Sequence, residues 1–212
     1  MTFAHAFLEP DAARSHSAEH SSILHPVALL AGLSVVSALL SNALPGPEVG
    51  LGYFQFPVLP GIYFGLVLVF GAASLATTNL WRLLALFAAV NAGWAVAYVA
   101  SFHFYDSSFQ RLLSPWGDSF WSCGLVGGAI GAVLTVCGVA CASPNFRTID
   151  NFLRTLAIGT LAGLLLECGE KSSPLDALPI HLGSVLPLFL AWQTAVAASI
   201  AYGLIGAPRV VR

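Results

Sequence analysis

Six long apolar stretches, separated by short polar segments, dominate the pattern of this chain. They cover residues 23–43, 58–78, 80–102, 119–142, 149–168 and 182–206. Each reaches the length of about 20 residues that an α-helix needs to cross the hydrocarbon core of a bilayer. They are longer and more evenly apolar than the strands of a membrane β-barrel, which alternate over about 10 residues. The pattern therefore predicts an all-α integral membrane bundle of six transmembrane helices.

Charged residues avoid these stretches. The charged residues inside them are Arg82, Asp150, Arg154 and Glu167, and Asp150 and Arg154 have the spacing of an ion pair along a helix. Of all 212 residues, 57% are hydrophobic and 8% are charged, whereas about 25% of an average soluble domain is charged. This composition excludes an ordinary cytosolic enzyme and a disordered protein. The net charge of −2 lacks the basic excess of a nucleic-acid binder, so we expect the lipid bilayer as a partner and no nucleic acid.

The segment before the first span is polar, and we expect residues 1–22 to be a flexible cytoplasmic tail ahead of one domain, 23–212. The tail lacks the basic start and apolar core of a signal peptide. Six spans place both termini on one side, which holds six of the eight basic residues. Those six are Arg14, Arg82, Arg147, Arg154, Arg209 and Arg212. The positive-inside rule then predicts cytoplasmic termini in an inner membrane.

Two segments of the chain share a short pattern. Residues 79–85 and 151–157 both read Asn, two apolar residues, Arg, any residue, Leu, Ala. Each lies in a pair of neighbouring spans, so the hairpins 58–102 and 119–168 are candidate copies of one duplicated unit. Chance similarity is the alternative, since apolar helices use few residue types. A true duplication would give the pseudo-symmetry that many transporters show.

Two other stretches carry a resemblance to known proteins. They are Pro-Gly-Ile-Tyr-Phe-Gly at 60–65 and Ala-Trp-Gln-Thr-Ala at 191–195. In these stretches the chain resembles a class of small, uncharacterised bacterial inner-membrane proteins. The resemblance implies a six-span bacterial membrane protein, and it brings no activity and no functional residue with it.

Polar side chains near the middle of the spans are the first candidates for function. Asn91 is at the centre of the third span, and Gln193 and Thr194 are at the centre of the sixth. They predict a polar path or a midplane substrate site. The alternative is that they form interhelical hydrogen bonds, worth about 0.6–2 kcal/mol each, that hold the bundle together.

A second group of candidates lies near the proposed outer face. His103, Glu167 and His181 are a candidate cation or proton site, since a carboxylate and imidazoles can bind a cation or respond to pH. Solvated loop positions are the alternative. Cys123 and Cys168 fall at the outer ends of neighbouring spans, where a disulfide is permitted if that side is the periplasm. We expect no resident metal and no cofactor.

Small residues and turn residues complete the pattern. The fourth and fifth spans carry glycines at spacings that let helix backbones approach closely. These candidate helix-packing residues are Gly124, Gly127, Gly128, Gly131, Gly159 and Gly163. The segment 44–60 is rich in Pro and Gly, and we expect it to be a loop on the outer interface.

The sequence thus favours a non-catalytic membrane subunit or assembly scaffold, which would act with a membrane-protein partner or as a homo-oligomer. The alternative is a small permease-like transporter with a midplane polar site. An enzyme is the least favoured class, because the chain has no nucleophile elbow, no zinc-protease motif and no P-loop.

Overall fold

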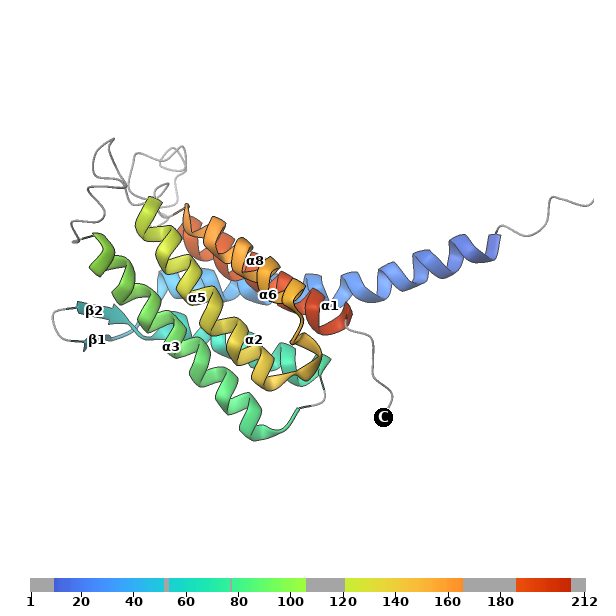
Figure 1. The fold of residues 1–212 in the computed structure, drawn as a ribbon, viewed down its shortest axis with the longest axis horizontal. Helices are drawn as coiled ribbons and strands as arrows, with labels where there is room; N and C mark the ends of the chain where they lie inside the picture. The colour runs from blue at the N-terminus through green and yellow to red at the C-terminus, as the bar shows by residue number, and fades with distance from the viewer. Residues whose placement is uncertain (1–9, 52–53, 77, 106–120, 166–185, 207–212) are drawn as a thin grey trace, which may run out of the picture.

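The structure, a computed structural model, describes residues 10–51, 54–76, 78–105, 121–165 and 186–206. Within these ranges the chain forms six α-helices, one 3₁₀ helix and one pair of antiparallel strands (Figure 1). In chain order they are α1 (Pro10–Ala43), β1 (Glu48–Leu51), β2 (Phe54–Pro57), α2 (Leu59–Leu75), α3 (Leu80–Tyr105), α5 (Trp121–Ala142), η1 (Pro144–Phe146), α6 (Ile149–Gly163) and α8 (Leu186–Gly206). The helical class of the fold is confirmed.

Four of the helices are long and apolar enough to cross a membrane. They are the portions Leu24–Ala43 of α1, Leu80–Phe104 of α3, Ser122–Ala142 of α5 and Leu186–Ile205 of α8. With 17 and 15 residues, α2 and α6 fall short of the usual span length of about 20 residues. The structure therefore contains a helix at each of the six predicted spans, and four of them meet the length of a span.

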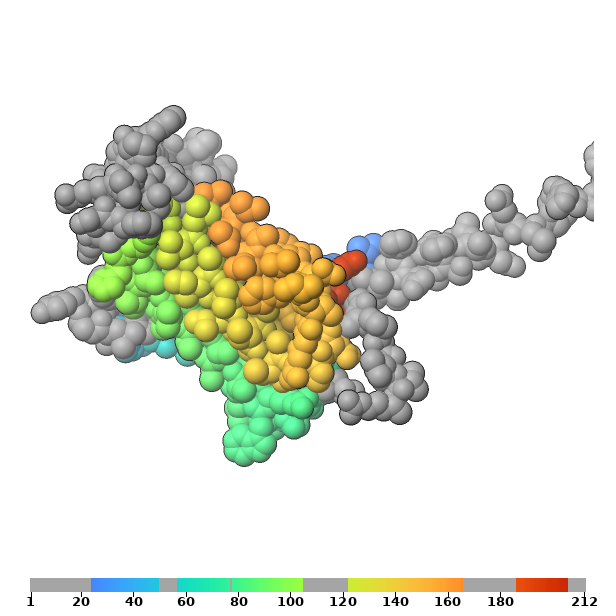
Figure 2. Space-filling view, viewed as in Figure 1, coloured from blue at the N-terminus to red at the C-terminus, as the bar shows by residue number. Residues whose placement is uncertain are grey.

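The six helices pack as a closed ring. Going around it, α1 packs on α2, α2 on α3, α3 on α5, α5 on α6, α6 on α8, and α8 back on α1. Figure 2 shows α3, α5 and α6 side by side on one face of the molecule. The ring closes over a common core of side chains that are at most 4% exposed, among them Phe64 of α2, Leu86 of α3, Val139 of α5 and Ile200 of α8.

Helix α1 differs from its prediction at its start. It begins at Pro10, inside the segment expected to be a flexible tail, and its first turns project away from the bundle in Figure 1. Pro is tolerated at the first position of a helix. Pro26 lies inside α1, ahead of Leu30, which is 1% exposed and packs in the bundle. Hydropathy marked the apolar part of this helix and missed its polar extension.

The expectation of a loop at 44–60 is corrected by the strand pair. Glu48 pairs with Pro57 and Leu51 with Phe54, in strands of four residues each. Such short strands give too little alternation to be read from sequence. Gly46 supplies the turn after α1 with a φ of 78°, which is a left-handed conformation that favours glycine.

The two segments suggested as a repeat occupy different positions in their helices. Asn79 precedes α3, and its Oδ1 accepts a hydrogen bond from the backbone N–H of Arg82 at 3.0 Å. Asn151 instead is the third residue of α6, and Thr148 caps that helix by accepting from the Asn151 N–H at 3.3 Å. The duplication stays a prediction.

Candidate functional site

A cavity of about 620 Å³ lies between five of the six helices. Its walls come from the end of α1, the start of α2, the second half of α3, and the first halves of α5 and α8, together with Pro57 of β2. It therefore occupies the half of the bundle that carries the strand pair, which Figure 1 places beside the end of α3. Helix α6 is the one helix of the described ring that does not line it.

Aromatic side chains form one wall of this cavity. The ring of Phe64 on α2 meets that of Trp192 on α8 edge-on at 5.4 Å, and Trp94 on α3 meets Phe189 on α8 at 5.4 Å. The ring of Tyr98, one turn after Trp94 on α3, lies 5.8 Å from the ring of Trp94. These separations fall in the favourable range of about 4.5–7 Å for aromatic pairs. The wall is thus a continuous apolar surface contributed by three helices.

The opposite wall is made by glycines of α5. Gly124, Gly127, Gly128 and Gly131 all line the cavity. A Cβ atom at Gly131 would lie 3.0 Å from Cζ2 of Trp192, and one at Gly127 would meet the hydroxyl of Ser101. Trp192 of α8 and Ser101 of α3 therefore pack directly against residues of α5 that have no side chain, and a larger residue at these positions would not fit.

The same helix uses two of these glycines to approach α6. A Cβ atom at Gly128 would meet the carbonyl oxygen of Gly159, and one at Gly163 would meet the carbonyl oxygen of Gly124. A Cβ atom at Gly159 would lie 2.6 Å from that of Ala132. All six glycines singled out in the sequence therefore lie at contacts inside the bundle.

Of the three midplane polar residues, Gln193 belongs to the cavity wall. It is 3% exposed, and its Nε2 donates to Ser41 Oγ at 3.2 Å. Ser41 Oγ in turn donates to the carbonyl of Ser37 at 2.8 Å, while Gln193 Oε1 has no hydrogen-bond partner among the described residues. Gln193 thus links α8 to α1 and keeps one unpaired acceptor in the interior.

The other two polar residues lie elsewhere. Asn91 Nδ2 donates to the carbonyl of Phe87 in its own helix at 2.8 Å, and its Oδ1 lies 3.0 Å from the Cβ position of Gly61. Asn91 therefore lies between α3 and α2, beside the cavity and outside its lining. Thr194 also lies outside the lining, with a buried hydroxyl that has no partner in the described chain. The predicted three-residue site does not assemble.

The lining carries no charged side chain in the part of the chain that the structure describes. Its polar side chains are the uncharged Ser41, Asn42, Tyr98, Ser101 and Gln193. Burial of an unpaired charge in such a wall would be costly, since the interior offers no counter-charge. The cavity therefore suits an uncharged and largely apolar molecule.

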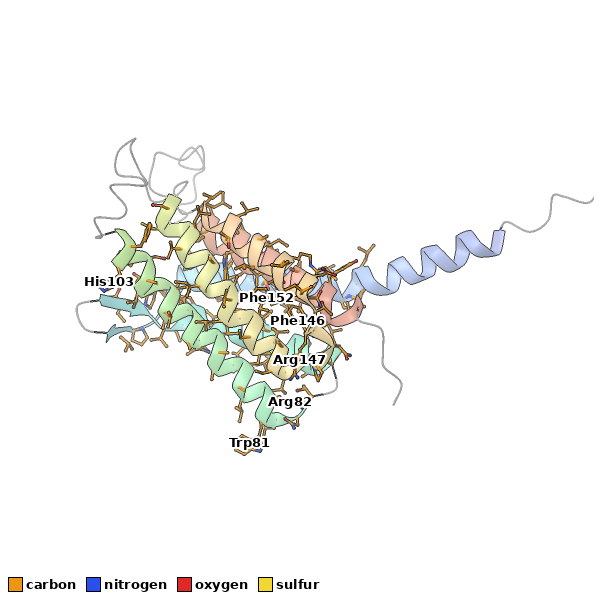
Figure 3. All side chains as sticks on the ribbon, in the orientation of Figure 1. Trp81, Arg82, His103, Phe146, Arg147 and Phe152 are labelled. Carbon is orange, nitrogen blue, oxygen red and sulfur yellow. The ribbon has the colours of Figure 1, made fainter. Side chains whose placement is uncertain are left out.

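The predicted outer-face site falls mostly outside the described residues. His103 is exposed in the last turn of α3, beside the strand pair in Figure 3, while Glu167 and His181 lie outside the described ranges. The described residues contain no group of three or more His, Cys, Asp or Glu that could hold a metal ion. Cys123 lines the cavity at 2% exposure, and Cys168 lies outside the described residues. The cation site and the disulfide both stay predictions.

A polar cluster between α6 and α8 was missed by the sequence reasoning. Arg154 donates from Nε to Ser199 Oγ at 3.2 Å, and from Nη2 to the Ser199 carbonyl at 3.1 Å and Asn151 Oδ1 at 2.8 Å. Its guanidinium also lies over the ring of Tyr202 at 4.7 Å. The expected ion pair with Asp150 does not form, because Asn151 and α8 hold the guanidinium instead. The available signal in the sequence was Arg154 three residues after Asn151, a spacing that places the two side chains on the same face of a helix.

Comparisons of the chain with protein-family models, with curated proteins and with solved structures found no match. The resemblance to bacterial inner-membrane proteins therefore stays a hypothesis. The two stretches that carry it, 60–65 and 191–195, meet at the cavity, where the rings of Phe64 and Trp192 are in contact.

Proposed function

We propose that the chain is a six-span membrane protein, with both termini in the cytoplasm of a bacterial cell, that acts as a small permease-like transporter. Its substrate is an uncharged apolar or lipid-like solute. The observation that carries this proposal is the cavity of about 620 Å³ between five helices. Its volume falls within the range of about 300–1,000 Å³ typical of small-molecule sites.

The ring supports a six-span arrangement in spite of two short helices. Helix α2 packs between α1 and α3, and α6 packs between α5 and α8. Each short helix thus lies against two helices that are long enough to cross a membrane. Local thinning of the bilayer accommodates a span that is a few residues short at modest cost. The exposed Leu66 and Phe70 of α2 and the exposed Leu161 of α6 fit a lipid-facing position.

Two lining residues of α8 hold polar atoms with unused hydrogen-bonding capacity. Gln193 Oε1 and the indole N–H of Trp192 are buried and have no hydrogen-bond partner among the described residues. An unpaired buried donor or acceptor costs about 1–3 kcal/mol. A solute with one hydroxyl or amide group on an apolar body would relieve part of that cost once one of these side chains turned its polar atom toward the cavity, so we infer a solute of this kind.

The glycines of α5 do not favour the scaffold hypothesis. A scaffold that used them would need to present them to another protein, whereas they pack against α3 and α6 or line the cavity. The experiment therefore has to distinguish a bound partner protein from a bound solute.

The test is purification in mild detergent, followed by native mass spectrometry of the intact chain and of Ala97→Phe. Ala97 lines the cavity, and Ala92 on the same helix is exposed and outside the lining. Because a phenyl ring at Ala97 partly fills the cavity and blocks it beside α5, we expect the wild type and Ala92→Phe to retain a small molecule that Ala97→Phe loses. Leu188→Trp, at another lining residue, gives a second partly filled cavity should Ala97→Phe fail to fold.

Proteoliposomes then measure transport of the retained molecule. We expect uptake by the wild type and Ala92→Phe, and uptake at the protein-free rate with the filled cavity. A stoichiometric protein companion in place of a small molecule would overturn the proposal in favour of a scaffold. Retention that is equal in the filled and control variants would overturn the assignment of the cavity as the site.

A further inference from the structure

The cluster around Arg154 holds a cation in an unusual setting for a membrane helix. Its guanidinium is fixed by three hydrogen bonds, two to Ser199 and one to Asn151. Thr155 supports the cluster through a 2.8 Å hydrogen bond between its hydroxyl and that of Ser199. A side chain held at this many points has lost its freedom to reach out to distant water. The position of the charge is therefore set by the fold.

No carboxylate neutralises this charge within the described residues. Asp150 is exposed on the same helix, one turn earlier, and makes no ion pair with Arg154. The partners of the guanidinium are an amide, a hydroxyl, a backbone carbonyl and an aromatic face, and none of these carries a formal charge. The cluster orients the cation and leaves its charge uncompensated.

The cluster lies near one end of the bundle, at its outer surface. Arg154 follows the start of α6 at Ile149 by five residues, about 8 Å along a helix, and Ser199 precedes the end of α8 at Gly206 by seven residues, about 10 Å. Tyr202, whose ring faces the guanidinium, is 53% exposed on the outside of the bundle. Tyrosine is enriched near the boundary between the hydrocarbon core and water. An exposed tyrosine beside the cation fits a site that a lipid reaches from that end of the bundle.

The unused part of the guanidinium can bind an anion. Nε and Nη2 are engaged with Ser199 and Asn151, while Nη1 has no partner in the described part of the chain. A guanidinium binds phosphate oxygens through short, charge-assisted hydrogen bonds. A basic position between membrane helices on the cytoplasmic side is the kind of place where lipid phosphates dock.

We propose that Arg154, positioned by Asn151 and Ser199 at the interface of α6 and α8, binds the phosphate group of an anionic membrane lipid. Helix α6 does not line the cavity, so this site is separate from the one assigned to the solute. The lipid is a structural or regulatory ligand that fastens α6 to the bilayer. This proposal stands whether or not the cavity transports anything.

The test compares lipid retention by Arg154→Gln and Arg82→Gln with that of the wild type. Arg82 is an exposed arginine at the start of α3, near Arg147 in Figure 3, and serves as the matched control. Each protein is titrated in detergent with phosphatidylglycerol, or with a diacylglycerol glycolipid that has no phosphate, and native mass spectrometry counts the bound lipids. We expect at least about a tenfold loss of phosphatidylglycerol binding in Arg154→Gln, the size of a charge-assisted hydrogen bond. We expect no loss in Arg82→Gln and no change with the glycolipid.

Two further arms separate the alternatives. Arg154→Lys keeps the charge and loses the planar fork, so we expect partial recovery of phosphatidylglycerol binding relative to Arg154→Gln. Inorganic phosphate added to the wild type tests whether the site binds a free anion instead of a lipid. We expect the added phosphate to leave the bound lipid in place. Lipid retention that is unchanged in Arg154→Gln, an equal loss in Arg82→Gln, or full displacement by inorganic phosphate would each overturn the proposal.

Discussion

Substitution of Gly159 by alanine tests how tightly α5 and α6 approach each other. The new Cβ would stand 2.6 Å from the Cβ of Ala132, and 3.3 Å from both the carbonyl oxygen of Gly128 and the indole nitrogen of Trp192. Ordinary carbon contacts lie at about 3.5–4.0 Å. The new methyl group is thus blocked by two helices, and α5 and α6 have to separate by about 1 Å to admit it.

The magnitude follows from two opposing effects. Overpacking of a close contact costs about 1–3 kcal/mol. Alanine regains about 1 kcal/mol over glycine through its greater helix propensity. The net change is therefore a loss of up to about 2 kcal/mol. Gly32 of α1 provides the matched control, because a Cβ there meets nothing within 4 Å. Since both variants share the propensity gain, their difference isolates the contact, and we expect it to be about 1–3 kcal/mol.

The assay is unfolding in mixed micelles with increasing sodium dodecyl sulfate, followed by tryptophan fluorescence. We expect the midpoint to fall for Gly159→Ala and to stay or rise slightly for Gly32→Ala. Because the clash involves the methyl group of Ala132, Gly159→Ala should cost less in an Ala132→Gly background than in the wild type. Equal midpoints for Gly159→Ala and Gly32→Ala, or an equal cost of Gly159→Ala in the two backgrounds, would refute the close approach of α5 and α6.

Four further substitutions, at three positions, test individual contacts, three of them by the same unfolding assay and Trp94→Phe by proteolysis. Thr148→Ala removes the cap that accepts from the Asn151 N–H, and should cost about 1 kcal/mol; an unchanged midpoint would contradict the cap. Trp94→Phe keeps a ring but removes the indole donor to the Pro57 carbonyl at 2.7 Å, so proteolysis at the strand pair should accelerate, and an unaltered rate would argue against this anchor. Gln193→Leu removes one hydrogen bond and one unpaired acceptor, so stability should change by less than about 1 kcal/mol. Gln193→Glu should instead lower the stability clearly, because this substitution buries a charge. Equal midpoints for Gln193→Leu and Gln193→Glu would show that water reaches this position.

Helix positions could be predicted where a polar break coincides with a backbone signal. The predicted starts at 80 and 149 agree with the structure, and each follows a capping residue, Asn79 or Thr148. The predicted end of the fifth span at 168 differs, because α6 ends at Gly163. Hydropathy reports which residues tolerate lipid, and it does not report where the backbone stops being helical. The polar extension of α1 was missed for the same reason.

The candidate site was harder to predict, because sequence gives the depth of a residue and not its rotation about the helix axis. Asn91 and Gln193 were both placed near the middle of their spans. The structure turns Gln193 toward the cavity and Asn91 toward α2. Similarly, the spacing of Asp150 and Arg154 predicted an ion pair, yet Arg154 turns toward α8 and donates hydrogen bonds to Ser199. These differences depend on which helices are neighbours in the ring.

The glycines of α5 connect the architecture of the bundle with its cavity. A Cβ atom at Gly131 would lie 3.0 Å from the ring of Trp192, and one at Gly159 of α6 would lie 3.3 Å from the indole nitrogen of the same residue. Trp192 therefore touches both the cavity wall and the close contact between α5 and α6. A methyl group at Gly159 that separates these helices should also displace the indole of Trp192. The packing of α5 on α6 and the shape of the cavity thus depend on the same side chain. Loss of stability in Gly159→Ala and loss of the retained solute should therefore occur together.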